Sequence, residues 1–80
     1  MMQVMLDKFL EQYKALDKKC DRFWDLMERY KKEGNKEKSV RCEKKMDEVS
    51  AEMDGMRNAL CCFGYTVVNQ QGNLVIVSIN

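Results

Sequence analysis

The sequence predicts an α+β fold: a long antiparallel two-helix coiled-coil hairpin followed by a C-terminal β-hairpin, with two chains assembled as a dimeric four-helix bundle. Three observations predict it. Apolar residues recur at alternating steps of four and three through residues 2–63, a glycine interrupts this pattern at position 34, and the final residues form two β-branched runs around a polar turn. A chain of 80 residues is expected to form a single domain, 1–80.

The first helix is expected over about residues 2–33. Its apolar positions step by four and three without a break, which is a heptad seam, whereas a strand would alternate with period two. A rise of about 1.5 Å per residue makes this helix about 45 Å long. The seam positions are Met2, Leu6, Phe9, Tyr13, Leu16, Cys20, Phe23, Met27 and Tyr30.

The second helix is expected over about residues 36–63, with its own seam. Gly34 can adopt the left-handed conformation that ends the first helix, and Asn35 can cap the second, with Ser39 as a later alternative start. So short a link makes the helices antiparallel. Gly64 is the corresponding glycine at the far end of the second helix. The second seam consists of Cys42, Met46, Val49, Met53, Met56, Leu60 and Phe63.

The C-terminal residues, about 65–79, are expected to form a β-hairpin. Residues 65–68 and 74–77 are rich in β-branched and aromatic side chains, which favour strands. Residues 69–73 between them have turn chemistry, with Gly72 able to take a positive φ. Both a two-residue and a three-residue loop fit this segment.

Two features predict self-association, with a dimer as the leading state. Apolar residues flank the seam of the first helix and make its apolar stripe wider than one partner helix covers. The second strand is apolar on both faces, and a lone two-stranded hairpin is marginal in water. The predicted oligomer or partner interface comprises Met5, Leu10, Trp24, Leu26, Val75 and Val77. For Trp24, a place in the dimer core, a hot spot for another protein and a stacking platform for a base all remain open. Parallel and antiparallel dimers also both remain open.

Positive charge is concentrated around the turn that links the two helices. Residues 31–45 carry seven basic side chains against three acidic ones, about +4, whereas residues 46–80 carry one basic against four acidic, about −3. This basic tip can contact an anionic partner, such as an acidic protein surface, nucleic acid or a phosphorylated ligand, or it can be a solvated turn. The basic tip consists of Lys31, Lys32, Lys36, Lys38, Arg41, Lys44 and Lys45.

Several function classes are disfavoured. The chain has no histidine, no phosphate-binding glycine loop and no paired metal-ligand spacing, so we expect no enzymatic activity, no cofactor and no metal site. Its four cysteines are expected to be reduced thiols, with a redox role for Cys61 and Cys62 as an alternative. The N-terminal residues lack the pattern of a signal peptide, so we expect none there, and no apolar run is long enough to span a bilayer. We therefore expect a cytoplasmic location, in a bacterial cell or an infected host cell.

The run from Arg57 to Val77, R-N-A-L-C-C-F-G-Y-T-V-V-N-Q-Q-G-N-L-V-I-V, resembles the C-terminal part of small uncharacterised proteins encoded by bacteriophages and mobile elements. The helical hairpin before it is similar to phage accessory proteins. Some such proteins inhibit bacterial immune systems by contacting nuclease effectors, and others sequester cyclic-nucleotide signals. The resemblance implies a small non-enzymatic binder and assigns no functional residue.

The leading hypothesis is therefore a homo-oligomeric, non-enzymatic accessory factor that binds and inhibits a host component, most simply a protein. A second hypothesis is an oligomeric sponge for a small phosphorylated ligand such as a cyclic nucleotide. In that case the basic tip, Arg22 or Arg57 would hold phosphate, and Trp24 or a tyrosine would stack on the base. A third is a weak nucleic-acid binder acting through the basic tip.

Overall fold

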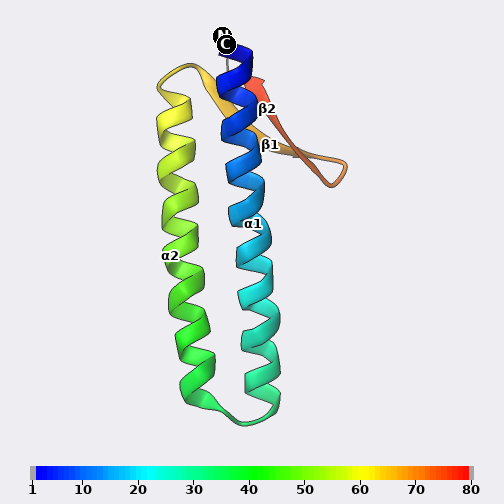
Figure 1. Ribbon diagram of the computed structural model, residues 1–80, viewed down its shortest axis with the longest axis vertical. Coiled ribbons are helices and arrows are strands. Elements are labelled where there is room, and N and C mark those ends of the chain that lie inside the picture. The colour runs from blue at the N-terminus through cyan, green and yellow to red at the C-terminus, as the bar shows by residue number, and fades with distance from the viewer. Residues whose placement is uncertain (1, 80) are drawn as a thin grey trace.

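The computed structural model describes residues 2–79, with side chains from residue 3 onward. Helix α1 (Met2–Lys32) and helix α2 (Lys36–Cys61) form an antiparallel pair, followed by strands β1 (Tyr65–Gln70) and β2 (Asn73–Ser78), as Figure 1 shows. The α+β prediction, with two long helices before an antiparallel β-hairpin, is confirmed. The seam position predicted at Met2 lies outside the described side chains.

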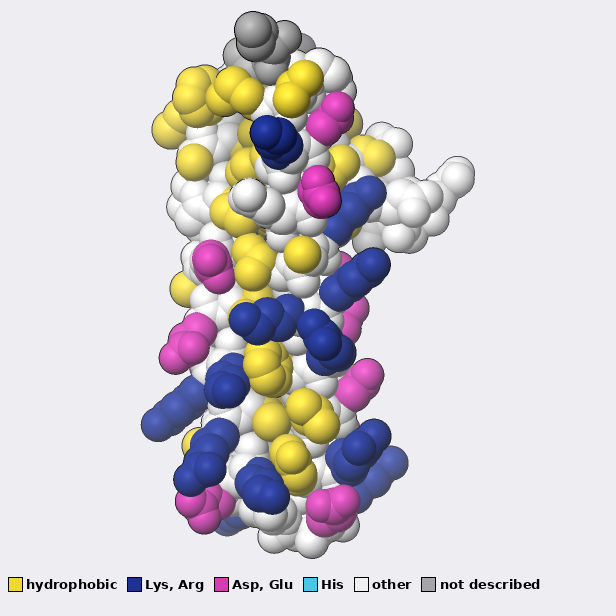
Figure 2. Space-filling view, in the orientation of Figure 1, with side chains coloured by type: hydrophobic (Ala, Val, Ile, Leu, Met, Phe, Trp, Pro, Cys, Tyr) yellow, Lys and Arg dark blue, Asp and Glu magenta, His cyan; other side chains and the backbone are white. Residues whose placement is uncertain are grey.

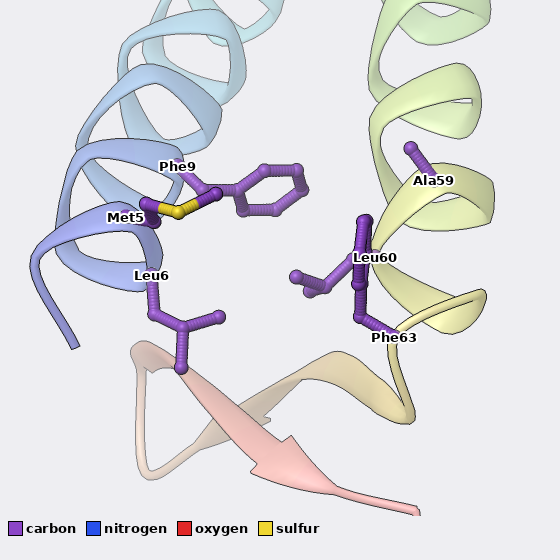
Figure 3. Close-up of a pocket in the computed structure, with 6 residues that line it drawn as sticks. All are labelled: Met5, Leu6, Phe9, Ala59, Leu60 and Phe63. Atoms are coloured by element: carbon purple, nitrogen blue, oxygen red, sulfur yellow. The ribbon is translucent and has the colours of Figure 1, made fainter. Parts of the chain in front are cut away.

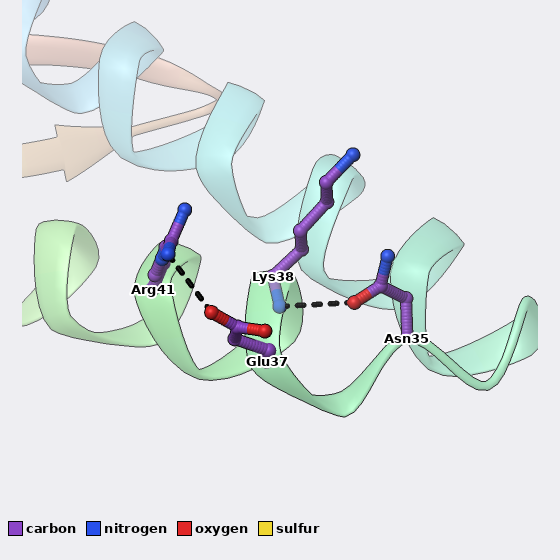
Figure 4. A network of polar contacts seen from close by, with 4 residues as sticks. All are labelled: Asn35, Glu37, Lys38 and Arg41. Atoms are coloured by element: carbon purple, nitrogen blue, oxygen red, sulfur yellow. Dashed lines mark hydrogen bonds and ion pairs between the residues drawn. The ribbon is translucent and has the colours of Figure 1, made fainter.

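The turn between the helices has the predicted capping chemistry. Gly34 has a φ of +76°, its N–H donates to the carbonyl of Lys31 at 3.1 Å, and the N–H of Asn35 donates to the carbonyl of Tyr30 at 2.8 Å. These two bonds make a Schellman motif, which closes α1. The side-chain oxygen of Asn35 then accepts a hydrogen bond from the backbone N–H of Lys38 at 3.2 Å and caps α2 (Figure 4). The cap is therefore Asn35 and not Ser39.

The core lies along the predicted seams, and it is thin. Five apolar residues are buried, and all are seam positions: Tyr13, Met27, Cys42, Val49 and Leu60. Ser39 is also buried, so the seam of α2 begins one step earlier than its apolar residues indicate. Of the described residues, none is less than 2% exposed. A helical pair this narrow leaves every core residue in some contact with water.

The end of α2 differs from the prediction. The helix ends at Cys61, because the last turn tightens into bonds from the N–H of Phe63 to the carbonyl of Leu60 (3.0 Å) and from the N–H of Gly64 to the carbonyl of Cys61 (2.9 Å). Gly64, with a φ of +85°, then reverses the chain. The tightened turn rotates Phe63 off the seam and leaves it 67% exposed, so its assignment to the second seam was wrong.

The β-hairpin uses the shorter of the two loops that the sequence allowed. Gln70 pairs with Asn73, which leaves a two-residue loop. Both loop residues have positive φ, 54° at Gln71 and 86° at Gly72, as in a type I′ turn. The side-chain oxygen of Asn69 accepts from the N–H of Gly72 at 3.0 Å and fixes the turn.

The β-hairpin packs against the N-terminal half of α1 and returns the C-terminus to the end where α1 begins (Figure 1). Leu6 and Leu10 of α1 line one hollow together with Tyr65, Val75 and Ile76 of the strands. The basic tip lies at the opposite end of a molecule 49 Å long. Within residues 2–79, neither helix contains a segment long and apolar enough to cross a bilayer.

Candidate interaction groove

Three hollows between α1 and α2 lie end to end and form one groove. Their floor on α1 is built from Phe9, Leu16, Phe23 and Tyr30, which recur every seven residues. Residues seven apart on a helix lie along nearly the same line, so this floor extends over about 31 Å. Figure 2 shows apolar side chains in a stripe along the helical pair, flanked near the basic tip by lysine and arginine side chains.

The groove lies on a different face of α1 from the one that the β-hairpin covers. Its lining includes Met5 and Phe9, whereas the hollow beneath the β-hairpin is lined from α1 by Gln3, Asp7 and Leu10. Leu6 lies between the two faces and lines both hollows. The helical pair thus has one face that its own strands cover in part and one face that they leave open.

The hollow nearest the chain termini, the terminal hollow, has no charged or polar side chain in its lining. Its volume is about 140 Å³, and Figure 3 shows side chains from α1 and from the end of α2 directed toward one another across it. Met5 and Phe63 at its rim are 63% and 67% exposed. The apolar surface at this end of the molecule is therefore uncovered. The lining residues are Met5, Leu6, Phe9, Ala59, Leu60 and Phe63.

The hollow nearest the basic tip, the tip hollow, combines aromatic rings with cations. Its volume is about 280 Å³. The ammonium group of Lys38 lies 5.5 Å from the centre of the Tyr30 ring, and that of Lys45 lies 5.6 Å from the centre of the Phe23 ring. Both distances allow a cation–π interaction. The remaining lining residues are Leu26, Arg41 and Cys42.

Arg41 is the third cation of the tip hollow, and its charge is partly compensated. Its guanidinium donates to a carboxylate oxygen of Glu37 one turn earlier at 2.9 Å (Figure 4), and both side chains are exposed. An exposed pair of this kind contributes little to stability, about 0.3–0.5 kcal/mol. The other two cations of the tip hollow, Lys38 and Lys45, form no ion pair with a described side chain.

The middle hollow, with a volume of about 420 Å³, has a mixed rim. Leu16 and Met56 form its apolar floor, and Lys19, Arg22 and Glu52 stand at its edge. The groove is thus graded along its length, from wholly apolar at the termini, through mixed charge, to basic and aromatic at the basic tip.

The structure divides the seven residues of the basic tip. Lys38, Arg41 and Lys45 line the groove. Lys31 and Lys36 line a separate hollow with Gly34, Ser39, Val40 and Glu43. Lys32 and Lys44 are exposed side chains. The basic tip is therefore two cationic surfaces, and one of them continues into the groove.

The predicted interface residues are also divided. Met5 and Leu26 line the groove, whereas Leu10 and Val75 line the hollow beneath the β-hairpin. Trp24 is 51% exposed and lies two heptads from Leu10, on the β-hairpin side of α1. Val77 is half-buried on β2. Only two of the six thus belong to the groove.

Sequence reasoning missed the pairing of Lys38 and Lys45 with Tyr30 and Phe23. A signal for it exists, because both pairs are spaced by seven residues on helices that run antiparallel. Once the short link is read as a tight turn, the two lysines fall at the levels of the two rings. The sequence alone indicated the lysines as a surface for an anionic partner or as a solvated turn, and the rings as seam residues, with no contact between them.

Two further groups bear on ligand and redox chemistry. Arg57 forms an ion pair with Asp54, whose hydrogen bond raises the pKa of the guanidinium, so its charge is compensated within α2. Cys61 and Cys62 are exposed and Cys42 is buried, and all are free thiols. Among residues 2–79 no three acidic or cysteine side chains gather as they would around a metal ion.

Comparisons with family models, with curated proteins and with solved structures gave no match. The resemblance of residues 57–77 to phage and mobile-element proteins stays a prediction. The case for a function therefore depends on the groove.

Proposed function

We propose that this chain is a small non-enzymatic interaction protein that associates with itself as a dimer and binds a host component. The observation that carries the proposal is the groove. Its floor of apolar and aromatic side chains is about 31 Å long, and within residues 2–79 the strands leave it uncovered. Lys19, Arg22 and Glu52 line its middle, and its two ends expose apolar and aromatic surface, which is typical of protein interaction sites.

The distribution of exposed apolar residues supports the proposal. Four of the six large apolar residues that the structure leaves exposed belong to the end of the molecule where α1 begins: Val4, Met5, Phe63 and Ile79 (Figure 1). The other two, Trp24 and Val40, lie nearer the basic tip. The thin core points the same way. None of the described side chains is fully buried, and a small domain of this kind gains most from burying surface against another chain.

A host component is proposed as the further partner because of the phage and mobile-element resemblance, with inhibition as the consequence of binding. The cationic surface around Lys31 and Lys36 lies outside the groove and stays accessible when the groove is covered. An acidic protein surface is the chemistry that complements it.

Size-exclusion chromatography with light scattering, at two protein concentrations and with reductant, tests self-association. We expect the wild-type chain to be a dimer and Leu16→Asp, in the middle of the groove, to be a monomer that keeps its helical circular dichroism. Trp24→Gln, on the other side of α1, is the matched control and is expected to remain a dimer. A wild-type chain that is monomeric at both concentrations would refute the proposal.

A specific observation favours one alternative, an oligomeric sponge for a small phosphorylated ligand. The tip hollow places the cations of Lys38 and Lys45 over aromatic rings, which is chemistry that can bind a nucleotide. A ligand at 100 times its dissociation constant adds about 2.7 kcal/mol. In a domain of this size that raises the melting temperature by about 10–20 °C. If none of a broad panel of cyclic and linear nucleotides shifts the melt, the alternative fails.

A further inference from the structure

We infer that the groove is filled by the groove of a second copy of this chain in antiparallel orientation, so that the tip hollow of each copy covers the terminal hollow of the other. The inference rests on the proposed self-association and adds which face is used and in which direction. Area, residue spacing and charge each support it.

The open face is large enough for a stable dimer. The groove floor is about 31 Å long, and two packed helices present a face about 20 Å wide, so each copy can bury about 600 Å². Two copies then bury about 1,200 Å² in total, the lower limit for specific stable interfaces. The exposed side chains of Met5 and Phe63 at the end of the groove add to this area.

The spacing of residues on α1 is compatible with a two-fold axis across the groove. An axis perpendicular to the helices, at the level between Asp17 and Lys18, sets α1 against the partner's α1 in the opposite direction. Met5 then lies at the level of the partner's Tyr30, and Phe9 at the level of the partner's Leu26. Both ends of the interface are therefore apolar or aromatic on both sides.

The charge distribution distinguishes the parallel from the antiparallel dimer. Residues 31–45 carry about +4 and residues 46–80 about −3. A parallel dimer would bring two basic tips together, within the screening length of about 8 Å at physiological salt. An antiparallel dimer keeps them at opposite ends of a body 49 Å long.

The hollow that each tip would meet also suits the antiparallel direction. The terminal hollow has no charged side chain in its lining, so the cations of Lys38, Arg41 and Lys45 meet no like charge there. Lysine and arginine can lay their aliphatic stems over apolar surface while their charged ends stay in water. In this arrangement Lys38 would cover apolar surface around the partner's Met5.

Cross-linking of the wild-type dimer tests the direction. Equal amounts of unlabelled and ¹⁵N-labelled chains are mixed, treated with a short amine-reactive linker and digested, so that peptides carrying both labels report links between chains. The antiparallel arrangement predicts mixed links from Lys8 to Lys36 or Lys38. Within one chain Lys8 and Lys38 are separated by about 33 Å of helix, beyond a short linker.

The outcomes separate the two proposals. A chain that is monomeric by light scattering overturns self-association and this inference with it. A dimer whose mixed links join Lys31, Lys36 and Lys38 of one tip to those of the other overturns the antiparallel direction and leaves the proposed function intact. A dimer with mixed links only through Lys14, Lys18 or Lys19 would also overturn the full overlap of the two grooves.

The salt dependence and charge variants of the dimer give an independent test. In the antiparallel arrangement the basic tips lie at opposite ends of the dimer, so screening by added salt should not tighten association. Changing Lys38, Arg41 and Lys45 together to Gln shortens the aliphatic stems that would cover the partner's terminal hollow, and we expect about fivefold weaker association. Lys8→Gln with Lys14→Gln is the matched control, since neither residue lines the groove, and it should leave association unchanged. A tip variant that tightens the dimer, as relief of repulsion between adjacent tips would, overturns the inference.

Discussion

Met27 and Leu26 are adjacent on α1, yet the structure assigns them to different environments. Met27 is 4% exposed between the two helices, whereas Leu26 is half-buried at the edge of the tip hollow. Changing each to alanine therefore compares the intramolecular core with the groove on one helix turn. The expected difference follows from burial alone, because the two side chains have similar volume and both are changed to the same residue.

For Met27→Ala, a buried methionine contributes about 1.5–3 kcal/mol by transfer from water, and the cavity it leaves raises the loss to about 2–5 kcal/mol. The thin core can relax around the gap, so we expect about 2–3 kcal/mol. The free energy of unfolding of a whole domain of this size is only about 4–12 kcal/mol. The melting temperature should therefore fall by about 10–20 °C, at any protein concentration.

For Leu26→Ala, the free energy of unfolding of the monomeric chain should fall by about 1 kcal/mol, because part of the side chain is already in water. At protein concentrations where the proposed dimer covers the groove, this decrease should be larger. Urea unfolding followed by circular dichroism, at two concentrations about a hundredfold apart, separates the two effects. A smaller loss for Met27→Ala than for Leu26→Ala at the lower concentration would show that α1 is rotated relative to this structure. A Leu26→Ala loss that does not change with concentration would argue against a second copy in the groove.

Three backbone and capping changes make further predictions, each measured by urea unfolding. Gly55→Ala should stabilise the chain by about 1 kcal/mol, because Gly55 is inside α2 and a methyl group there meets no atom within 4 Å; a loss would mean that another chain approaches its backbone. Gly34→Ala should destabilise by about 1–2 kcal/mol although the site has room, because its φ is +76°; a neutral result would contradict the left-handed turn. Asn35→Ala should cost about 1 kcal/mol, and Asn35→Ser should recover most of it; equal losses would show that the cap contributes nothing.

Much of the fold could be predicted from sequence because the strongest signals are local. The seams identified Tyr13, Met27 and Val49 as core residues, since heptad spacing alone decides which side chains face the other helix. Gly34 and Asn35 located the turn, because few other residues suit a left-handed position followed by a cap.

The features that sequence missed depend on backbone geometry that the residue types do not specify. The exposure of Phe63 follows from the tightening of the last turn of α2, which no residue in the heptad pattern signals. The hairpin loop was ambiguous because Gln71 has to take a positive φ of 54° that its type does not favour. The register of the strand pair decided between the two loops.

The seam of α1 contains two rows of residues, and the helical pair buries them unequally. In one row Tyr13 and Met27 are buried against α2, and Leu6 and Cys20 are half-buried. The other row is the groove floor, and all four of its residues remain partly exposed although three of them are aromatic. A single partner helix in a coiled coil normally packs against both rows of such a seam. The row that stays partly exposed, with the apolar side chains of Met5 and Leu26 beside it, is therefore the feature that favours a further helical layer. The sequence therefore carried the reason to propose an assembly, and the position of the charges relative to the groove, visible only in the structure, supports the direction that we propose for it.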